Sequence, residues 1–217
     1  MPQLKICGIT DAAFAVEAAR RGVDYLGLIF AVGSPRRVTV ERAHQIVTAV
    51  RSISPVGRGV LDAPQFVGVF VDHSAKKIMQ IASCLGLNVI QLHGNYDAKA
   101  VAALKAAGYE VWQLYDPSGG PRSCAAVADA VLLDGRKGTQ CGGTGVRADW
   151  SQVAVLKRAG YRVVLAGGLS AANVAAAVAT GADILDANST LETSPGQKSI
   201  RLLDEFLASI PRGIMVK

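Results

Sequence analysis

The chain has 217 residues, which is long enough to bury one sizeable core and somewhat short for two domains. Half of the residues are hydrophobic and only 6% are aromatic, a composition typical of parallel strands covered by Ala-rich helices. The net charge of +6 comes from scattered cations that are not interleaved with aromatic residues, which argues against nucleic-acid binding. A mildly basic surface also suits anionic small-molecule substrates such as phosphates.

Cysteine spacing and hydropathy indicate where the protein works. Cys7, Cys84, Cys124 and Cys141 are too widely spaced for a zinc pattern or for the disulfide framework of a small secreted domain. We therefore expect a reducing, cytoplasmic compartment. The sequence shows no N-terminal secretion signal and no apolar run of membrane-spanning length, so we expect the mature chain to begin at or near Met1, without a membrane partner.

Strand and helix patterns alternate along the chain. The first strand, residues 4–7, ends before Gly8, which permits a sharp turn, and Thr10 or Asp11 can cap a helix at residues 11–21. Further strands are expected at residues 23–30, 66–71, 88–92, 110–115, 130–133, 162–166 and 182–187. Further helices are expected from residue 39 onward, at 74–85, up to 107, at 123–129, at 150–159, at 171–180 and up to about 210.

This alternation of strands and helices predicts the fold class. With right-handed crossovers it gives a parallel sheet, and eight units in roughly 200–250 residues correspond to a closed (β/α)8 TIM barrel. We therefore expect an α/β protein in which residues 1–217 form a single (β/α)8 barrel domain. The alternative is a doubly wound open sheet, which is favoured if residues 110–115, the weakest strand pattern, do not form a strand.

Polar and reactive residues gather where the strands end, which is where a barrel of this type carries its function. Cys7 ends the first strand, Arg36 lies in the loop after the second, and His93 ends the fourth. Asp134 ends the sixth strand. The last two strand ends carry Gly167, Gly168, Asp186, Asn188 and Ser189. Because a barrel needs loops at this end but needs neither a thiol nor an acid there, the grouping indicates an enzyme.

The turns after the seventh and eighth strands fit a phosphate site. Residues 167–170 (Gly-Gly-Leu-Ser) and 188–190 (Asn-Ser-Thr) supply glycines, hydroxyls and an amide where such barrels commonly bind phosphate. The alternative is a pair of ordinary strand-to-helix turns. Another Gly-rich stretch, residues 142–145, lacks the Gly-Lys-Ser/Thr of a P-loop and is expected to belong to a mobile active-site loop.

Cys7 and Asp134 suit acid–base chemistry. Because their strands lie far apart around the barrel, the thiol and the carboxyl can face each other across a substrate, one removing a proton and the other delivering one. A free thiol has a pKa of about 8.5, so a cysteine base needs activation, and Lys5 on the same strand face can stabilise the thiolate. Alternatively, Cys7 is a small buried hydrophobe and Asp134 braces a loop or caps a helix. For Lys5 the alternative is a structural ion pair with Asp186.

The other polar residues admit two interpretations. Arg36 can hold a carboxylate by a bidentate contact, or it can be a solvated loop arginine. His93 can form a polar wall of the pocket, or it can belong to a hydrogen-bond network at the strand end. The remaining candidates have no expected chemical role: Cys84 and Cys124 as buried helix residues, Cys141 in the Gly-rich loop, and Asp149 and Glu192 as loop-bracing or capping carboxylates.

The sequence resembles the phosphoribosylanthranilate isomerase family of tryptophan biosynthesis along its whole length. Two motifs are specific: residues 5–10 (Lys-Ile-Cys-Gly-Ile-Thr), and residues 142–145 (Gly-Gly-Thr-Gly) followed by Asp149-Trp150. Looser motifs, shared by several phosphate-binding barrels, lie at residues 34–38, 67–70, 91–94, 132–134, 165–169 and 173–174.

The resemblance implies an Amadori rearrangement of N-(5-phosphoribosyl)anthranilate to 1-(2-carboxyphenylamino)-1-deoxyribulose 5-phosphate, without cofactor or metal. It implies that Asp134 is the general acid that opens the ribose ring and that Cys7 is the general base that takes the C2 proton. By the same resemblance Arg36 holds the anthranilate carboxylate, and the last two turns hold the phosphate. The predicted substrate-binding residues are Arg36, His93, Gly167, Gly168, Asp186, Asn188 and Ser189.

The chain departs from the family pattern near the phosphate. Asn188 stands where a serine is common, Thr190 where a glycine is common, and Ser199 where an aspartate is usual. Backbone contacts survive the change at Thr190 if this residue needs no positive φ. Two alternatives stay open: a related phosphosugar-processing barrel, such as an epimerase, or a non-catalytic barrel that binds a phosphate ligand. The sequence allows a monomer or a homodimer.

Overall fold

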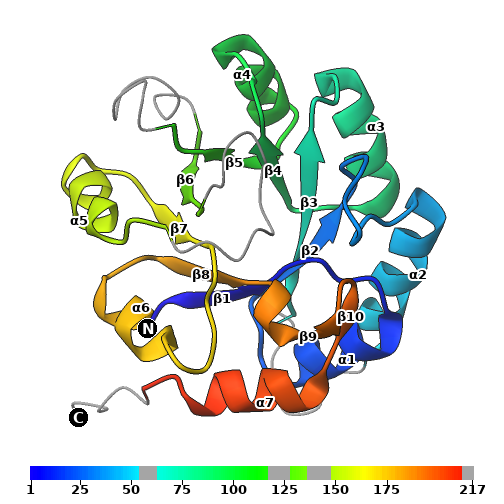
Figure 1. Ribbon diagram of the computed structural model, residues 1–217. Helices are drawn as coiled ribbons and strands as arrows, with labels where there is room; N and C mark the ends of the chain where they lie inside the picture. Colours follow the sequence, from blue (N-terminus) through cyan, green and yellow to red (C-terminus); the bar gives the residue numbers. More distant parts are fainter. Residues whose placement is uncertain (54–62, 117–127, 136–147, 212–217) are drawn as a thin grey trace.

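A computed structural model describes residues 1–53, 63–116, 128–135 and 148–211. Eight parallel strands close into a barrel in chain order, and helices surround it (Figure 1). The barrel strands are β1 (Gln3–Ile6), β2 (Tyr25–Ile29), β3 (Gln65–Val71), β4 (Val89–His93), β5 (Glu110–Leu114), β6 (Ala130–Leu133), β7 (Val163–Leu165) and β8 (Ile184–Ala187). The helices are α1 (Ala12–Arg20), α2 (Val40–Arg51), α3 (Ala75–Leu85), α4 (Ala98–Ala106), α5 (Ser151–Arg158), α6 (Val174–Ala179) and α7 (Ile200–Ala208).

The barrel predicted from the sequence is confirmed. β1 pairs with β2 on one side and with β8 on the other, so the sheet is a closed ring and not an open one. The weakest strand pattern forms β5, which pairs with both β4 and β6. Between β8 and α7 the chain adds a short helical turn, η3 (Ser189–Leu191), and a hairpin of β9 (Glu192–Ser194) and β10 (Gln197–Lys198).

Some sequence-based expectations lie outside the described residues. These are most of the helix at 123–129, the Gly-rich stretch at 142–145, and Cys124 and Cys141. Within the described ranges, the longest helices are too short or too polar to cross a lipid bilayer.

The alternation of side chains along the strands decides what lies inside the barrel. On β1, Ile6 packs outward against the helices, whereas Lys5 is fully buried in the interior. Cys7 follows Ile6 and again turns inward, beside Ile29. The neighbouring β2 leaves room because it carries Gly27, where an added Cβ would lie 2.8 Å from the Cys7 Sγ. The cation and the thiol thus share the inner face of β1, as the sequence predicts.

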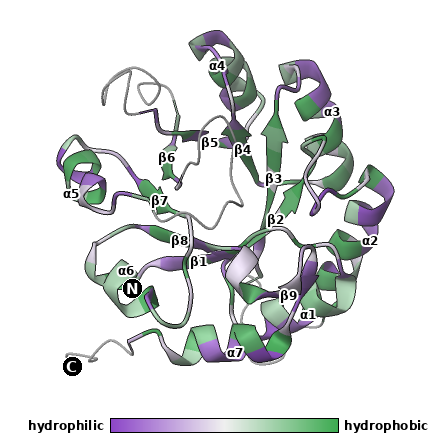
Figure 2. Ribbon diagram, viewed as in Figure 1, coloured by the Kyte–Doolittle hydropathy of each residue, from purple (hydrophilic) through white to green (hydrophobic). Residues whose placement is uncertain are grey.

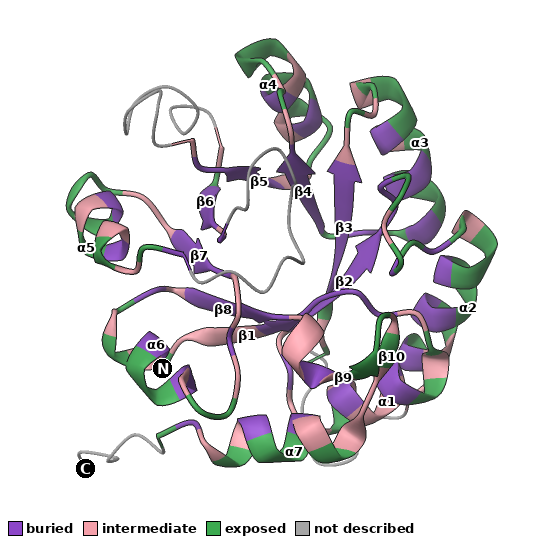
Figure 3. Cartoon of the chain, viewed as in Figure 1, coloured by how far each residue is buried: buried purple, intermediate pink, exposed green. Residues whose placement is uncertain are grey.

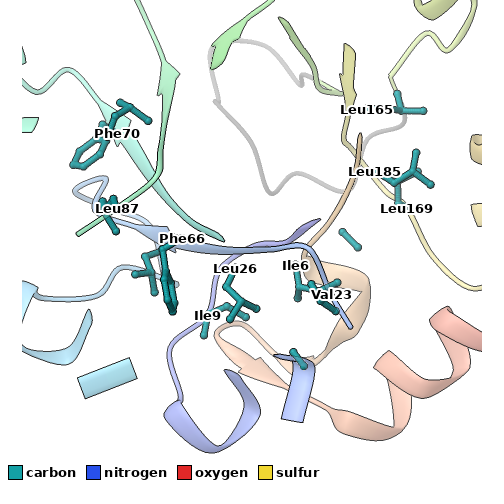
Figure 4. Packing of buried hydrophobic residues seen from close by; sticks show 14 of the residues in the cluster. Ile6, Ile9, Val23, Leu26, Phe66, Phe70, Leu87, Leu165, Leu169 and Leu185 are labelled. Carbon is teal, nitrogen blue, oxygen red and sulfur yellow. The ribbon is translucent and has the colours of Figure 1, made fainter. Parts of the chain in front are cut away.

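Apolar residues fill both sides of the strands. Figure 4 shows Ile6, Leu26 and Phe66 in the layer between barrel and helices. The interior is filled by Tyr25, Val67, Val89, Trp112, Leu114, Ala130, Leu132, Val164, Ala166 and Ile184. Figure 2 shows that polar residues concentrate on the helices, and Figure 3 shows that the barrel strands are mostly buried. The carboxyl ends of the strands therefore lie next to a closely packed apolar barrel interior.

Side-chain caps fix the starts of helices next to the strand ends. Of the two candidates before α1, Asp11 is the cap, because its carboxylate accepts a hydrogen bond from the Phe14 N–H at 2.8 Å. Ser199, which replaces the usual aspartate of the family, caps α7 by accepting from the Leu202 N–H at 3.4 Å. A cap of this kind stabilises a helix by about 1 kcal/mol.

A polar cluster lies at the amino ends of the strands. The Arg162 guanidinium, one-third exposed, donates to the Glu110 carboxylate and, from Nη2, to Gln3 Oε1 at 2.7 Å and the Tyr25 hydroxyl at 3.0 Å. The Trp112 indole donates to the same Glu110 carboxylate at 2.6 Å. One arginine therefore ties together β1, β2 and β5.

Replacing Arg162 with methionine should reduce stability without reducing activity. The loss removes three hydrogen bonds of a partly exposed charge, and we expect about 1–2 kcal/mol of destabilisation. For a chain of this size that lowers the midpoint of thermal unfolding by about 2–8 °C. Calorimetry of the parent and the Arg162→Met variant measures the shift, and an unchanged midpoint would show that the cluster stabilises nothing.

Candidate active site

A cavity of about 580 Å³ opens at the carboxyl ends of the strands. This is within the usual size range of small-molecule sites. It is lined by every residue predicted for the site: Cys7, Arg36, His93, Asp134, Gly167, Gly168, Asp186, Asn188 and Ser189. The closed ring brings these strand ends together although they are spread over most of the chain. Their individual roles stay predictions.

Lys5 connects the thiol to a buried carboxylate. Its Nζ lies 2.6 Å from Asp186 Oδ2, and the two residues are direct partners in the register of β1 and β8. The side chain of Lys5 is fully buried and that of Asp186 is 6% exposed. The other carboxylate oxygen, Asp186 Oδ1, is buried without a hydrogen-bond partner among the described residues. The structural ion pair considered for Lys5 is therefore present, at the wall of the cavity.

Burial and the ion pair with Asp186 shift the pKa values of Cys7 and Lys5. Burial raises the pKa of the Cys7 thiol, and the nearby Lys5 ammonium opposes that rise without cancelling it. Burial alone would lower the pKa of Lys5, but Asp186 and Cys7 outweigh it, so the pKa of Lys5 is raised. Lys5 therefore stays charged beside Cys7, and among the local charges it favours the thiolate most, ahead of Lys198.

Alkylation of Cys7 reports this pKa directly. Only the thiolate reacts, and a raised pKa means a smaller thiolate fraction at neutral pH than in an unperturbed thiol. We expect the rate of modification by iodoacetamide to keep rising beyond the roughly pH 8.5–9 at which a free thiol is half ionised. Peptide mass spectrometry separates Cys7 from the other cysteines, and the denatured chain is the control. A native-state plateau below pH 8.5 would contradict the raised pKa.

Two side chains of β4 form another part of the wall. Gln91 and His93 are two residues apart and both project into the barrel, with Gln91 Nε2 2.7 Å from His93 Nε2. When the amide donates this bond, the ring accepts at Nε2 and carries its proton on Nδ1. Gln91 Oε1 is buried and has no hydrogen-bond partner within the part of the chain that the structure describes. This amide therefore keeps one acceptor atom that is not used, in a residue of the cavity wall.

Arg36 is not a solvated loop arginine. It is 8% exposed, and its Nε and Nη2 donate to the Glu192 carboxylate at 2.9 and 2.8 Å. Lys198 donates to Glu192 Oε1 at 2.5 Å, the same oxygen that accepts from Arg36 Nε. Glu192 thus braces the loop, as expected from the sequence, and does so by holding a residue of the cavity wall.

The turns after β7 and β8 are joined to each other. Gly167 and Gly168 adopt positive φ values of 87° and 69°, which favour glycine. Thr190 donates its hydroxyl to the Leu169 carbonyl. Thr190 itself has no positive φ, since Asp72 is the one non-glycine residue with such a backbone in the described ranges. The change from the family glycine to Thr190 therefore leaves this backbone unstrained.

Sequence reasoning missed several residues of the site. Asp72, whose φ is 54°, and Gln91 both line the cavity, and Lys198 lies behind Arg36. Two features of the sequence could have predicted them as cavity residues: Asp72 directly follows a strand, and Gln91 alternates with His93 on the inward face of another. One expectation is wrong: Cys84 is exposed on α3, because the buried side of that helix is formed by Ile78, Ile81, Ala82 and Leu85. Within the described residues, no group of three His, Cys, Asp or Glu side chains is arranged to hold a metal ion.

Comparison with known proteins identifies the family of this chain. The family model for N-(5'-phosphoribosyl)anthranilate (PRA) isomerase matches residues 4–209. The chain belongs to this family. The PRA isomerase of Geobacter sp. strain M21 is 36% identical over 213 residues, covering 96% of this chain and 97% of its own length.

Two further similar proteins differ in how much of their own length the match covers. The tryptophan biosynthesis protein TrpCF of Vibrio cholerae is 38% identical over 210 residues, and the match covers 95% of this chain but 41% of that longer protein. A solved PRA isomerase in complex with reduced 1-(o-carboxyphenylamino)-1-deoxyribulose 5-phosphate is 26% identical, with a TM-score of 0.75, over 96% of this chain and 98% of the other. Proteins similar to this chain thus include chains of its own length and a longer protein of which the match covers less than half.

Proposed function

We propose that this protein is an isomerase that converts N-(5-phosphoribosyl)anthranilate to 1-(2-carboxyphenylamino)-1-deoxyribulose 5-phosphate in tryptophan biosynthesis. The observation that carries the proposal is a thiol after β1 and a carboxyl after β6 on the wall of one cavity, in a chain that belongs to the PRA isomerase family. The solved relative with a bound product analogue supports the same substrate class.

The chemistry needs one acid and one base. Asp134 gives its proton to the ring oxygen of the ribose, the bond between that oxygen and C1 breaks, and the nitrogen lone pair forms a C1=N iminium. The Cys7 thiolate then takes the proton from C2, and the electrons of that C–H bond form the C1=C2 bond while the iminium electrons return to nitrogen. The resulting enol takes a proton from water at C1 and releases the proton of its C2 hydroxyl to water, which gives the ketone. Proton exchange with water returns Cys7 to the thiolate and Asp134 to the acid. No cofactor enters this balance.

The remaining groups of the cavity bind the two anionic ends of the substrate. Arg36 holds the anthranilate carboxylate by charge-assisted hydrogen bonds. The backbone of Gly167-Gly168 and of Asn188-Ser189 holds the phosphate, with His93 and Asp186 on the wall between. The bond from Thr190 to the Leu169 carbonyl supports this assignment because it fixes the two turns to each other.

Further parts of the proposal concern the setting of the enzyme. It acts in the cytoplasm, as one barrel domain over residues 1–217, and as a monomer or a homodimer. Its partner is a small phosphorylated molecule and not a nucleic acid or a membrane. The scattered distribution of its cations supports this choice of partner.

Genetic complementation tests the proposal. A bacterial strain that lacks PRA isomerase, and therefore needs tryptophan, is transformed with the gene for this chain. We expect growth without tryptophan, and no growth from a Cys7→Ser/Asp134→Asn double variant produced at the same level. Failure of the parent gene to restore growth, with folded protein present in the cell, would contradict the proposed function.

A further inference from the structure

Three charged side chains form a buried cluster at the edge of the cavity. The side chain of Arg36 is 9% exposed, that of Glu192 is 3% and that of Lys198 is 2%. Glu192 lies between the two cations, accepting from Arg36 Nη2 at 2.8 Å and from Lys198 Nζ at 2.5 Å. Arg36 lines the cavity, whereas Glu192 and Lys198 do not.

The ammonium of Lys198 has no donor left for a ligand. Besides Glu192 Oε1, it donates to the Asn188 carbonyl at 3.1 Å and to Asn188 Oδ1 at 2.8 Å. A lysine ammonium has three donors, and all three are used. Lys198 therefore acts on a ligand only through the residues that it holds.

Arg36 keeps part of its donor set. Nε and Nη2 are directed at Glu192, and Nη1 makes no hydrogen bond to any described residue. A guanidinium has five N–H groups in a rigid planar fork, so fixing one edge on Glu192 also fixes the direction of the other. Glu192 thus orients Arg36 and leaves Nη1 for an anionic ligand.

Charge balance explains why a second cation is present. An arginine paired with a buried carboxylate is neutral as a pair and attracts an anion weakly. Two cations and one anion leave one net positive charge, which burial screens little from a ligand in the cavity. Burial lowers the pKa of Lys198 and outweighs the opposing effect of the bond to Glu192. The charged form is stabilised by its three oxygen acceptors, Glu192 Oε1, the Asn188 carbonyl and Asn188 Oδ1.

The fold places Lys198 where this balance needs it. Lys198 and Glu192 face each other in the register of β10 and β9, which form the short hairpin labelled near α1 in Figure 1. The hairpin is tied to the turn after β1, because Thr10 donates its hydroxyl to the Gly196 carbonyl. An added Cβ at Gly8 would lie 2.7 Å from Asn188 Oδ1 and 2.8 Å from Arg36 Cδ, so these parts are closely packed.

We propose that Lys198 is a positioning residue for recognition of the substrate carboxylate. Its ammonium neutralises the charge of Glu192. Glu192 can then hold Arg36 in one orientation while the positive charge of Arg36 stays available to the ligand. This inference rests on the proposed function, because the ligand carboxylate is that of the anthranilate ring. Asn188, the residue that departs from the family serine, supplies one of the oxygens that fix Lys198.

Two matched ligands test the proposal. One is the reduced product analogue, 1-(2-carboxyphenylamino)-1-deoxyribulose 5-phosphate reduced at its ketone, and the other lacks only the ring carboxyl group. We expect Lys198→Met to weaken binding of the first by about 10–100-fold, the usual effect of a charge-assisted hydrogen bond. Binding of the second should weaken less, because it lacks the carboxylate; a loss common to both ligands reports the contacts of Lys198 with Asn188 in the phosphate turn. Calorimetric titration gives both dissociation constants.

A second variant separates charge balance from a structural effect. Lys198→Met combined with Glu192→Gln again leaves Arg36 as an uncompensated cation, and should recover most of the affinity lost by Lys198→Met alone. Equal loss for both ligands, or a double variant no tighter than the single one, would overturn the proposal. Affinity for the ligand without a carboxyl group confirms that each variant has a folded site.

Failure of this inference is distinguishable from failure of the proposed function. A parent protein that neither turns over phosphoribosylanthranilate nor binds the reduced analogue contradicts the function. A parent protein that does both, with a Lys198→Met variant that binds the two ligands as the parent does, contradicts the role of Lys198 alone.

Discussion

Cys7→Ser is expected to lower the kcat for phosphoribosylanthranilate by about 10²–10⁴-fold, the usual contribution of one general base. Serine fits the same space beside Gly27, so the fold should not change. A serine hydroxyl does not ionise in the accessible pH range, however, even beside the Lys5 ammonium, so the variant has no anionic base in place of the thiolate. The KM should change little, because in the proposed mechanism the thiol removes a proton and does not hold an anionic end of the substrate.

The exposed cysteine of α3 provides the matched control. Cys84 does not line the cavity, so Cys84→Ser should retain the parent kcat and KM. Steady-state kinetics of the three proteins, followed by the fluorescence of the anthranilate group, compare the two substitutions. A Cys7→Ser enzyme with parent activity would mean that another group is the base, and Asp186, with its unpartnered Oδ1, would be the next candidate.

Asp134→Asn is expected to have an effect of similar size, about 10²–10⁴-fold on kcat. The amide has the shape of the carboxyl group but has no acidic proton at neutral pH, so it cannot protonate the ribose ring oxygen. The step that suffers is ring opening, which precedes the work of Cys7. Because the two residues act in one sequence, the double variant should lose much less than the product of the single losses.

Asp204→Asn serves as the control for this substitution. Asp204 is an exposed carboxylate on α7 that pairs with Arg21, away from the cavity. Its replacement should leave the kinetics unchanged. An Asp134→Asn enzyme as active as Asp204→Asn would remove Asp134 from the mechanism.

The sequence predicts the barrel and the strand ends because both follow from local patterns. Alternation along β1 puts Lys5 and Cys7 on one face, and closure of the ring then directs that face inward. The ion pair of Lys5 with Asp186 can also be expected from the sequence, because closure of the ring makes the first and last strands neighbours. The positions of the strand-end residues around the cavity are predictable in this way, and their chemical roles stay predictions.

Contacts between loops are not predictable in the same way. Lys198 reaches Glu192 through a hairpin of three residues paired with two, a feature too short for a periodic pattern. The exposure of Cys84 depends on which side of α3 faces the barrel, and a small apolar side chain carries little information about that. The sequence left open whether Arg36 holds a carboxylate or is a solvated loop arginine, because its bond to Glu192 depends on this hairpin.

Turnover of phosphoribosylanthranilate by the purified protein, in buffer with a chelator, tests the central claim most directly. Loss of substrate fluorescence, with formation of the carboxyphenylamino deoxyribulose phosphate identified by mass spectrometry, is the predicted result. A folded protein that binds inorganic phosphate but leaves the substrate unchanged would contradict the assignment of this barrel as an isomerase.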